Sequence, residues 1–193
     1  GIRSPIGMHG YRLEVEAHII TAAESTVENI RQSVEGAGIQ VSQFILNPLA
    51  SAEVVLSETE RNMGVIVCDI GGGTTEIAVI ALSGIVHEES IRIAGDEMNN
   101  AIMQFFKKNY NLLIGERTSE IIKCEVGSAV PLREEMTIQV KGRDLVGGIP
   151  KTAEVSSVEI RESLNENVNQ IVEAVKQTLE RTPAELSSDL VER

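Results

Sequence analysis

An acid, three glycines and two threonines lie together in the stretch "VIVCDIGGGTTEIAVIAL", residues 65–82, between two apolar runs. The residues concerned are Asp69, Gly71, Gly72, Gly73, Thr74 and Thr75. Glycine has no Cβ atom and tolerates positive φ, so a glycine turn lets several backbone N–H groups point at one phosphate. Asp69 supplies a hard oxygen ligand of the kind that holds Mg²⁺ through water beside phosphates. The spacing therefore indicates a phosphate-binding turn between two strands.

The same residues are also compatible with an ordinary glycine-rich hairpin in which Asp69 makes an Asx turn. A Walker-type phosphate loop is excluded, because no Gly-Lys-Ser/Thr follows and a strand pattern comes next in place of a helix. On these residues alone, both the phosphate site and the plain hairpin stay open.

The flanking patterns predict an α/β chain. Alternating or β-branched apolar runs predict strands, and apolar residues at helical spacing predict helices. The expected strands cover residues 11–20, 39–46, 65–70, 75–82 and 84–95, with a β-hairpin over 136–156. The expected helices lie within 24–38, 48–64, 95–115, 116–127 and 156–183. The N-caps that we expect are Ser25 or Thr26, Asp96, Thr118 or Ser119, and Ser156 or Ser157.

Composition excludes several classes of function. The chain has 17 Lys and Arg against 29 Asp and Glu, a net charge of −12, which disfavours binding to nucleic acid or anionic lipid. No apolar stretch reaches the roughly 18–20 residues of a membrane helix. The two cysteines have no metal-site spacing, and Cys68, in an apolar run, is expected in the core.

The pattern D-I-G-G-G-T-T-E resembles the second phosphate loop of the actin-like ATPases. From about residue 63 onward the chain resembles the bacterial MreB family, on the segments "SIRIAGDEMNNAI", "LIGERTSEIIKCEVGSA", "VKGRDLVGGIPKT" and "LERTPAELSSDLVER". Residues 1–63 resemble the cell-division family FtsA instead, on "GIRSPIGMHGYRLEVEAHIIT" and "ILNPLASAEVVLSETERNMG". A natural hybrid and a chimera joined at the glycine loop both remain open.

The resemblance implies the second domain of an actin-like ATPase, with a ribonuclease H-like α/β core and a smaller inserted α+β subdomain. Residues 64–93 and 156–193 would form the ATPase-core subdomain, and residues 94–155 the inserted subdomain. Residues 1–63 would be the tail of an FtsA-like first domain and its linking helix.

The resemblance also implies roles for individual residues. Gly71, Gly72, Gly73 and Thr74 would contact the β- and γ-phosphates of ATP, Asp69 would hold Mg²⁺ through water, and Thr75 would position the attacking water. Glu120 and Lys123 match a Glu and a Lys that flank ribose and adenine in the family. Without the family, a Glu/Lys pair at this spacing is typical of an exposed helix surface.

Departures from the family pattern bear on catalysis. Asn47 stands where MreB proteins carry a Glu that orients the hydrolytic water, and an amide cannot accept a proton as a carboxylate does. The first phosphate hairpin and the C-terminal glycine loop of the family are not found in the sequence. We therefore expect the chain to be a fragment with weak or no ATP binding and no activity of its own, and the parent to be at most a slow ATPase.

The function implied by the resemblance is that of an ATP-binding bacterial actin-like cytoskeletal protein, which polymerises to direct cell shape or division. The alternative is an FtsA-type, non-hydrolytic adaptor of the division machinery. A sugar kinase or chaperone fits less well, because neither would carry "GERTSEIIK" or "GRDLVGGIP". The expected partners are further copies of the protein and other cell-shape or cell-division proteins, without nucleic acid. The expected location is the cytoplasm, at the inner face of the cell membrane through partners, since no membrane-attachment segment is visible.

Overall fold

The computed structural model describes residues 7, 9–12, 19, 21–81 and 84–183, and these divide into two compact units, Gly1–Phe44 and Ile45–Arg193. In the first unit, helix α1 (Glu24–Gly36) has no buried residue, and the Arg31 guanidinium lies 5.1 Å from the centre of the Phe44 ring. The N-cap of α1 is Ala23, without a side-chain bond, so the predicted Ser25 or Thr26 cap is wrong. No strand forms over residues 39–46, and most of the predicted strand 11–20 lies outside the described residues.

In the second unit, strands β1 (Val65–Ile70), β2 (Thr75–Ala81) and β3 (Gly84–Ile91) form an antiparallel sheet in that order, which confirms the predicted meander. Helices α2 (Asn47–Val55) and α3 (Glu58–Met63) precede the sheet. Pro48 lies in the first turn of α2 as predicted, but a capping box from Ser57 to Glu60 starts a separate helix. We call α2, α3 and β1–β3 the sheet lobe. Its core holds Ala52, Val67, Ala78, Ile80 and Ile85.

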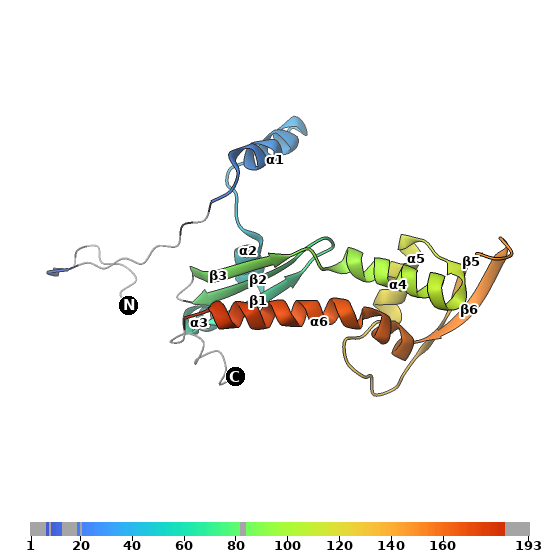
Figure 1. Ribbon diagram of the computed structural model, residues 1–193. Coiled ribbons are helices and arrows are strands. Elements are labelled where there is room, and N and C mark those ends of the chain that lie inside the picture. Colours follow the sequence, from blue (N-terminus) through green and yellow to red (C-terminus); the bar gives the residue numbers. More distant parts are fainter. Residues whose placement is uncertain (1–6, 8, 13–18, 20, 82–83, 184–193) are drawn as a thin grey trace. The chain divides into compact units, whose positions relative to one another are not determined.

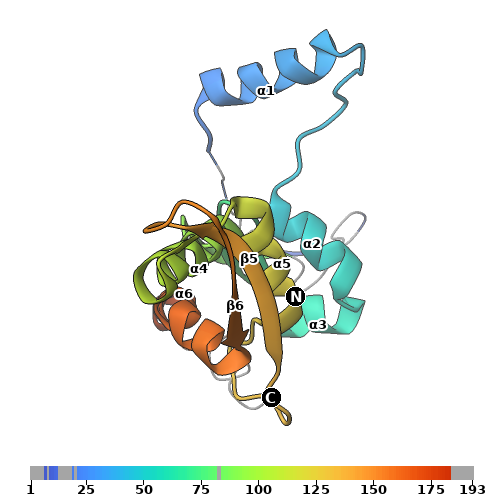
Figure 2. The same ribbon diagram turned by 90° about the vertical axis from the view of Figure 1, so that its right-hand side faces the viewer.

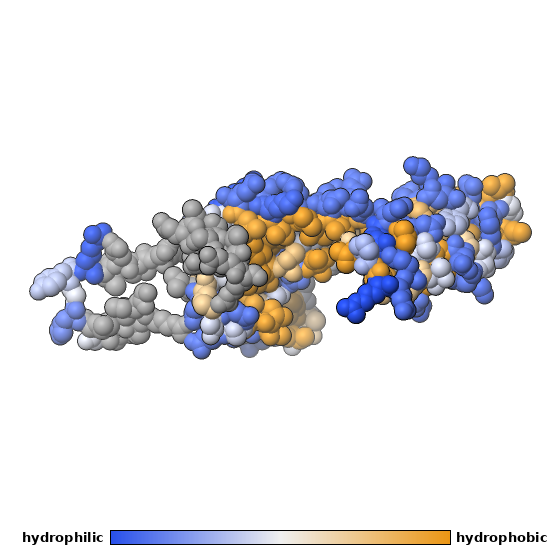
Figure 3. Space-filling model, turned by 90° about the horizontal axis from the view of Figure 1, so that it is seen from below, coloured by the Kyte–Doolittle hydropathy of each residue, from blue (hydrophilic) through white to orange (hydrophobic). Residues whose placement is uncertain are grey.

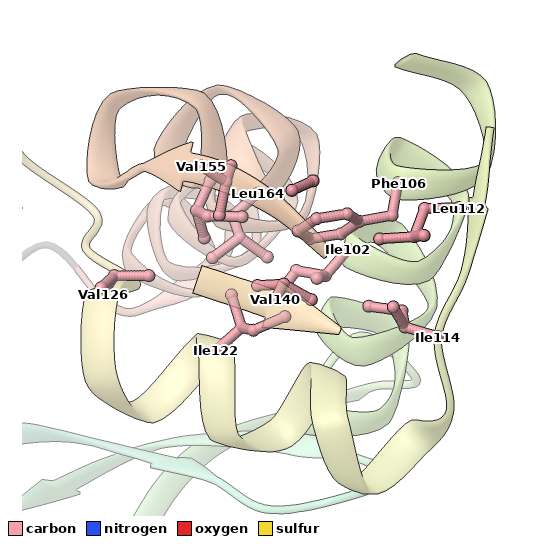
Figure 4. Packing of buried hydrophobic residues seen from close by; sticks show 11 residues of the cluster. Ile102, Phe106, Leu112, Ile114, Ile122, Val126, Val140, Val155 and Leu164 are labelled. Carbon is pink, nitrogen blue, oxygen red and sulfur yellow. The ribbon is translucent and has the colours of Figure 1, made fainter. Parts of the chain in front are cut away.

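The rest of the second unit is the hairpin lobe: helices α4 (Gly95–Tyr110) and α5 (Glu116–Val126) with strands β4 (Leu112–Leu113), β5 (Thr137–Asp144) and β6 (Pro150–Ser156). The predicted 95–115 helix ends early because Asn111 adopts left-handed backbone angles, with φ of 50°. Figure 2 shows the β5–β6 hairpin with α4 and α6 to its left. Figure 4 shows the core of this lobe, built from Ile102, Phe106, Leu112, Ile114, Ile122, Val126, Val140, Ala153, Val155, Ile160 and Leu164.

Helix α6 (Ser157–Arg181) connects the two lobes. Ser156 caps it in a capping box with Glu159, as the sequence predicted for this serine. Its first half contributes to the core of the hairpin lobe, and its second half runs beneath the three-stranded sheet (Figure 1). There the Thr178 hydroxyl donates to Glu89 on β3 at 3.4 Å. Among the described helices, α6 included, none is long and apolar enough to cross a lipid bilayer.

The side of β1 that faces α6 remains partly uncovered. Cys68 pairs with Ile77 and Ile70 with Thr75, so all four side chains lie on the face where α6 covers β2 and β3. Ile70 is nevertheless 51% exposed and Cys68 is exposed. Figure 3 shows exposed hydrophobic surface on this side of the molecule. The prediction that Cys68 is a core residue is therefore wrong, because α6 packs on β2 and β3 and leaves this face of the edge strand β1 largely uncovered.

A close backbone approach in the hairpin lobe generates a stability prediction. A Cβ added at Gly142 on β5 would lie 2.6 Å from the Leu113 carbonyl oxygen and 2.8 Å from the Leu112 Cγ. We expect Gly142→Ala to lower the free energy of unfolding by about 1–3 kcal/mol, since overpacking forces the strands apart. Urea unfolding followed by circular dichroism measures the change.

The matched control is Gly84→Ala, also on a strand, where the nearest described atom to the added Cβ is the Ala81 carbonyl oxygen at 3.8 Å. Its unfolding free energy should stay close to that of the wild type. If Gly142→Ala is as stable as Gly84→Ala, β4 and β5 do not lie as close together at Gly142 as the structure indicates.

Candidate functional site

The glycine turn between β1 and β2 is closed by a hydrogen bond from the Gly71 N–H to the Thr74 carbonyl, at 2.9 Å. Gly71, Gly72 and Gly73 are exposed, and none of them has positive φ. Glycine is needed here for room, because a Cβ on Gly71 would lie 3.1 Å from the Thr74 oxygen. The expected reliance on positive φ is therefore wrong for this turn, while the expected place of the three glycines is confirmed.

The start of α4 is bound to the inner side of the turn. The N–H groups of Gly95 and Asp96 donate to the carbonyls of Gly71 and Gly72, at 3.1 Å and 2.8 Å. A Cβ on Gly95 would lie 3.3 Å from the Gly71 oxygen, so this contact requires glycine at position 95. Ala94 is the N-cap of α4 and Asp96 lies within its first turn, so the predicted Asp96 cap is wrong. The contact with the turn occupies two of the first N–H groups of α4.

Two backbone N–H groups of the turn are free to donate hydrogen bonds. Within the described part of the chain, the N–H groups of Gly72 and Gly73 meet no acceptor. Both residues are exposed, and a Cβ on either would contact the Asp96 carboxylate at 3.6–3.8 Å. Successive backbone N–H groups in an exposed turn without side chains can form an anion-binding concavity. The geometry can therefore bind phosphate oxygens.

Asp69, at the end of β1, is held from the neighbouring helix. The Ser51 hydroxyl on α2 donates to Asp69 Oδ2 at 2.6 Å, which leaves Oδ1 without a protein donor among the described residues. No group of three or more metal-ligating His, Cys, Asp or Glu side chains occurs in the part of the chain that the structure describes. A single carboxylate fits Mg²⁺ that keeps most of its waters and is shared with phosphates. The contact of Ser51 with Asp69 could not be predicted from the sequence, because no motif links a serine to an acid 18 residues away.

Thr75 and Asn47, which we expected to lie near the attacking water, do not line the glycine turn directly. Thr75 is fully buried, and its hydroxyl donates to the Ile93 carbonyl at 2.6 Å, so in this conformation it faces the interior and not the turn. Asn47 is exposed at the first position of α2. It precedes Ser51 by one helical turn and so shares the side of α2 that contacts Asp69.

Glu120 and Lys123 on α5 are tied to the turn through the start of α4. Lys123 Nζ donates to the Gly95 carbonyl at 3.2 Å and to Glu120 Oε2 at 2.7 Å. Asn99 Nδ2, on α4, donates to the same Glu120 oxygen at 2.7 Å. Only 18% of the Lys123 side chain is exposed, against 49% for Glu120. The pair is therefore an anchored cluster and not a mobile surface ion pair.

Sequence reasoning missed Asn99. It lies on the apolar side of α4, three residues before Ile102 and seven before Phe106, and only 3% of it is exposed. A polar residue in an otherwise buried stripe was the available signal.

The same contacts fix the charge of Glu120. Hydrogen bonds from Lys123, then from Asn99 and then from Cys124 hold the pKa of Glu120 down at about 2, against an ordinary value of 4.5. The carboxylate is therefore an ionised acceptor at neutral pH, next to a half-buried cation.

This lowered pKa gives a prediction. A depressed carboxyl pKa stabilises the fold above the ordinary value of 4.5, and this contribution is lost as the pH falls toward about 2. Lys123→Met removes the largest cause, so the pKa of Glu120 should rise toward 4.5. A ¹³C NMR titration of the Glu120 carboxyl carbon measures the shift.

The control is Lys176→Met, which removes an exposed cation that pairs with Glu173 on α6. It should leave the Glu120 titration as in the wild type. An unchanged Glu120 pKa in Lys123→Met would contradict the geometry of the cluster.

Comparisons with known proteins identify the family and the fold of the chain. The family model described as MreB/Mbl protein matches residues 17–193. The chain is 46% identical over 164 residues to the cell shape-determining protein MreB of Escherichia coli K12, covering 85% of this chain and 47% of that protein. It is 42% identical over 174 residues to the cell shape-determining protein Mbl of Bacillus subtilis 168, covering 90% and 52%. The chain thus spans about half the length of the curated relatives it matches.

Among solved structures, MreB5 of Spiroplasma citri bound to ADP superposes with a TM-score of 0.82 at 34% identity, covering 87% of this chain and 51% of that chain. The same protein bound to AMPPNP gives a TM-score of 0.81. The chain therefore has part of the fold of an actin-like ATPase, as expected. The family match begins at residue 17, far before residue 63, so the resemblance extends into the segment that we expected to be FtsA-like.

Proposed function

This chain belongs to the MreB/Mbl protein family, and from that premise we propose that the native protein binds ATP with Mg²⁺ and assembles into filaments that determine cell shape. The observation that carries the nucleotide part is the exposed glycine turn, where the N–H groups of Gly72 and Gly73 have no acceptor among the described residues. Such donors suit the oxygens of a β- or γ-phosphate.

The other contacts of the nucleotide follow from the same cluster. Asp69, with Oδ2 held by Ser51, would accept from a water on Mg²⁺, and the ion supplies positive charge that neutralises the phosphates. Glu120 would accept from ribose hydroxyls, and Lys123 would lie against the base or the sugar. The structural relative MreB5, solved with ADP and with AMPPNP, supports a nucleotide as the ligand.

The residues present favour slow hydrolysis. Asn47 has no carboxylate to accept a proton from water, and the Thr75 hydroxyl is occupied by the Ile93 carbonyl. The bound nucleotide would therefore act mainly as a ligand that stabilises one arrangement of the protein. Slow hydrolysis would limit how long that arrangement lasts.

Filament assembly is proposed from family membership. The curated relatives are cell shape-determining proteins, and the match from residue 17 favours this function over the FtsA-type adaptor. We propose a cytoplasmic location at the inner face of the cell membrane, reached through partner proteins of the cell-shape machinery.

Isothermal calorimetry of the native full-length protein with Mg–ATP tests the nucleotide site. Wild type should bind, and Gly73→Val should weaken binding by about tenfold or more, roughly 1.4 kcal/mol per factor of ten, because a branched side chain covers the free donors. Glu120→Ala should also bind more weakly. Glu125→Ala, an exposed acid on the same helix, should bind as the wild type does.

Absence of binding by the wild-type protein would reject ATP as its ligand. Sedimentation with and without Mg–ATP then separates the two functions, since a filament protein yields nucleotide-dependent pellets. A protein that binds Mg–ATP but forms no sedimenting polymer would support the adaptor alternative.

A further inference from the structure

Asn99 is a buried polar side chain that the site as proposed so far does not use. It is 3% exposed on α4, in the stripe that also carries Ile102 and Phe106, both 0% exposed. Placing a carboxamide in such a stripe is unfavourable unless its donors and acceptor find partners. The side chain therefore needs an explanation beyond packing.

Only half of the Asn99 amide is satisfied. Nδ2 donates to Glu120 Oε2 at 2.7 Å, while Oδ1 is buried without a hydrogen-bond partner among the described residues. Turning the amide over would place Oδ1 against a carboxylate, which can only accept. Glu120 therefore fixes the orientation of Asn99, and the unpaired Oδ1 is the consequence.

The carboxylate of Glu120 is bound unequally. Oε2 accepts from both Asn99 Nδ2 and Lys123 Nζ, each at 2.7 Å, whereas among the described residues Oε1 accepts only from the Cys124 thiol, a weak donor, at 3.4 Å. The Glu120 side chain is 49% exposed. Oε1 is thus the oxygen that remains available to a ligand.

We propose that Asn99 is a positioning residue, which holds the Glu120 carboxylate from the buried side so that Oε1 faces the ribose hydroxyls of the bound nucleotide. This inference rests on the proposed ATP site. Lys123 supplies charge at the end of a long side chain that also donates to the Gly95 carbonyl, whereas Asn99 is short and buried on α4 in the same stripe as Ile102 and Phe106. Asn99 therefore determines the orientation of the Glu120 carboxylate, and Lys123 keeps that carboxylate ionised.

Directional control makes the site selective for a ribose. An ionised carboxylate can only accept, so a ligand without ribose hydroxyls leaves Oε1 without a donor. If the Glu120 carboxylate could rotate freely, it would discriminate less between ligands with and without ribose hydroxyls. Asn99 should therefore contribute to the preference for ATP over 2′,3′-dideoxy-ATP without touching the nucleotide.

Asn99→Leu separates positioning from packing. Leucine has nearly the same size and removes both the donor Nδ2 and the unpaired Oδ1, so the melting temperature should be unchanged or higher. The pKa of Glu120 should nevertheless rise from about 2 toward 4.5, in a ¹³C NMR titration of the chain without nucleotide. Asn100→Leu, at the next and exposed position, should leave this pKa unchanged. Asn99→Ala provides the same measurement if leucine disturbs the fold.

The second measurement is the ratio of the affinities for ATP and 2′,3′-dideoxy-ATP in the native full-length protein. We expect the ratio to fall severalfold in Asn99→Leu, toward that of Glu120→Ala, and to stay at the wild-type value in Asn100→Leu. An unchanged ratio, or an unchanged Glu120 pKa in Asn99→Leu, would overturn the proposal.

The two measurements test different claims, so a negative result in one can be told apart from a negative result in the other. A wild-type protein that binds no nucleotide rejects the proposed function and the ribose contact with it, whereas the Glu120 titration alone decides whether Asn99 holds the carboxylate.

Discussion

Two backbone hydrogen bonds, from the N–H groups of Gly95 and Asp96 to the carbonyls of Gly71 and Gly72, hold the start of α4 against the glycine turn. They use the carbonyls of Gly71 and Gly72, whereas the N–H groups of Gly72 and Gly73 have no acceptor among the described residues. They also fix the Gly95 carbonyl, to which Lys123 donates from α5. The phosphate end and the nucleoside end of the candidate site therefore meet at one junction between the sheet lobe and the hairpin lobe.

The junction matters because the chain is strongly acidic, with a net charge of −12. Such a charge repels a nucleotide polyanion at long range, so binding must come from local donors at short distance. Backbone N–H groups provide them without adding a cation, and the half-buried Lys123 adds one positive charge where Glu120 and the Gly95 carbonyl hold it in place. A Mg²⁺ ion at Asp69 would neutralise the phosphates further.

Elements with strong local patterns could be predicted from the sequence. The glycine hairpin, the β5–β6 hairpin and the Ser156 cap were all predicted, because periodicity, turn residues and capping chemistry act over a few neighbouring positions. The strand expected at 39–46 does not form, since alternation alone forms no strand without a partner strand.

The candidate site was predictable only in part. Its glycines and acids follow from one motif and a family resemblance, but Ser51 and Asn99 act across 18 and 21 residues. No local pattern specifies which distant carboxylate a serine or an asparagine will contact. The pairing arises only when α2 packs on the sheet and α4 packs on α5.

The most direct test of the account is amide hydrogen exchange by NMR at the glycine turn and the start of α4. Without ligand, the amides of Gly95 and Asp96 should be protected and those of Gly72 and Gly73 should exchange freely. Adding Mg–ATP to the native full-length protein should slow exchange at Gly72 and Gly73. Protection of these two glycines before nucleotide is added, or no change after it is added, would contradict the claim that the turn keeps its donors free for phosphate.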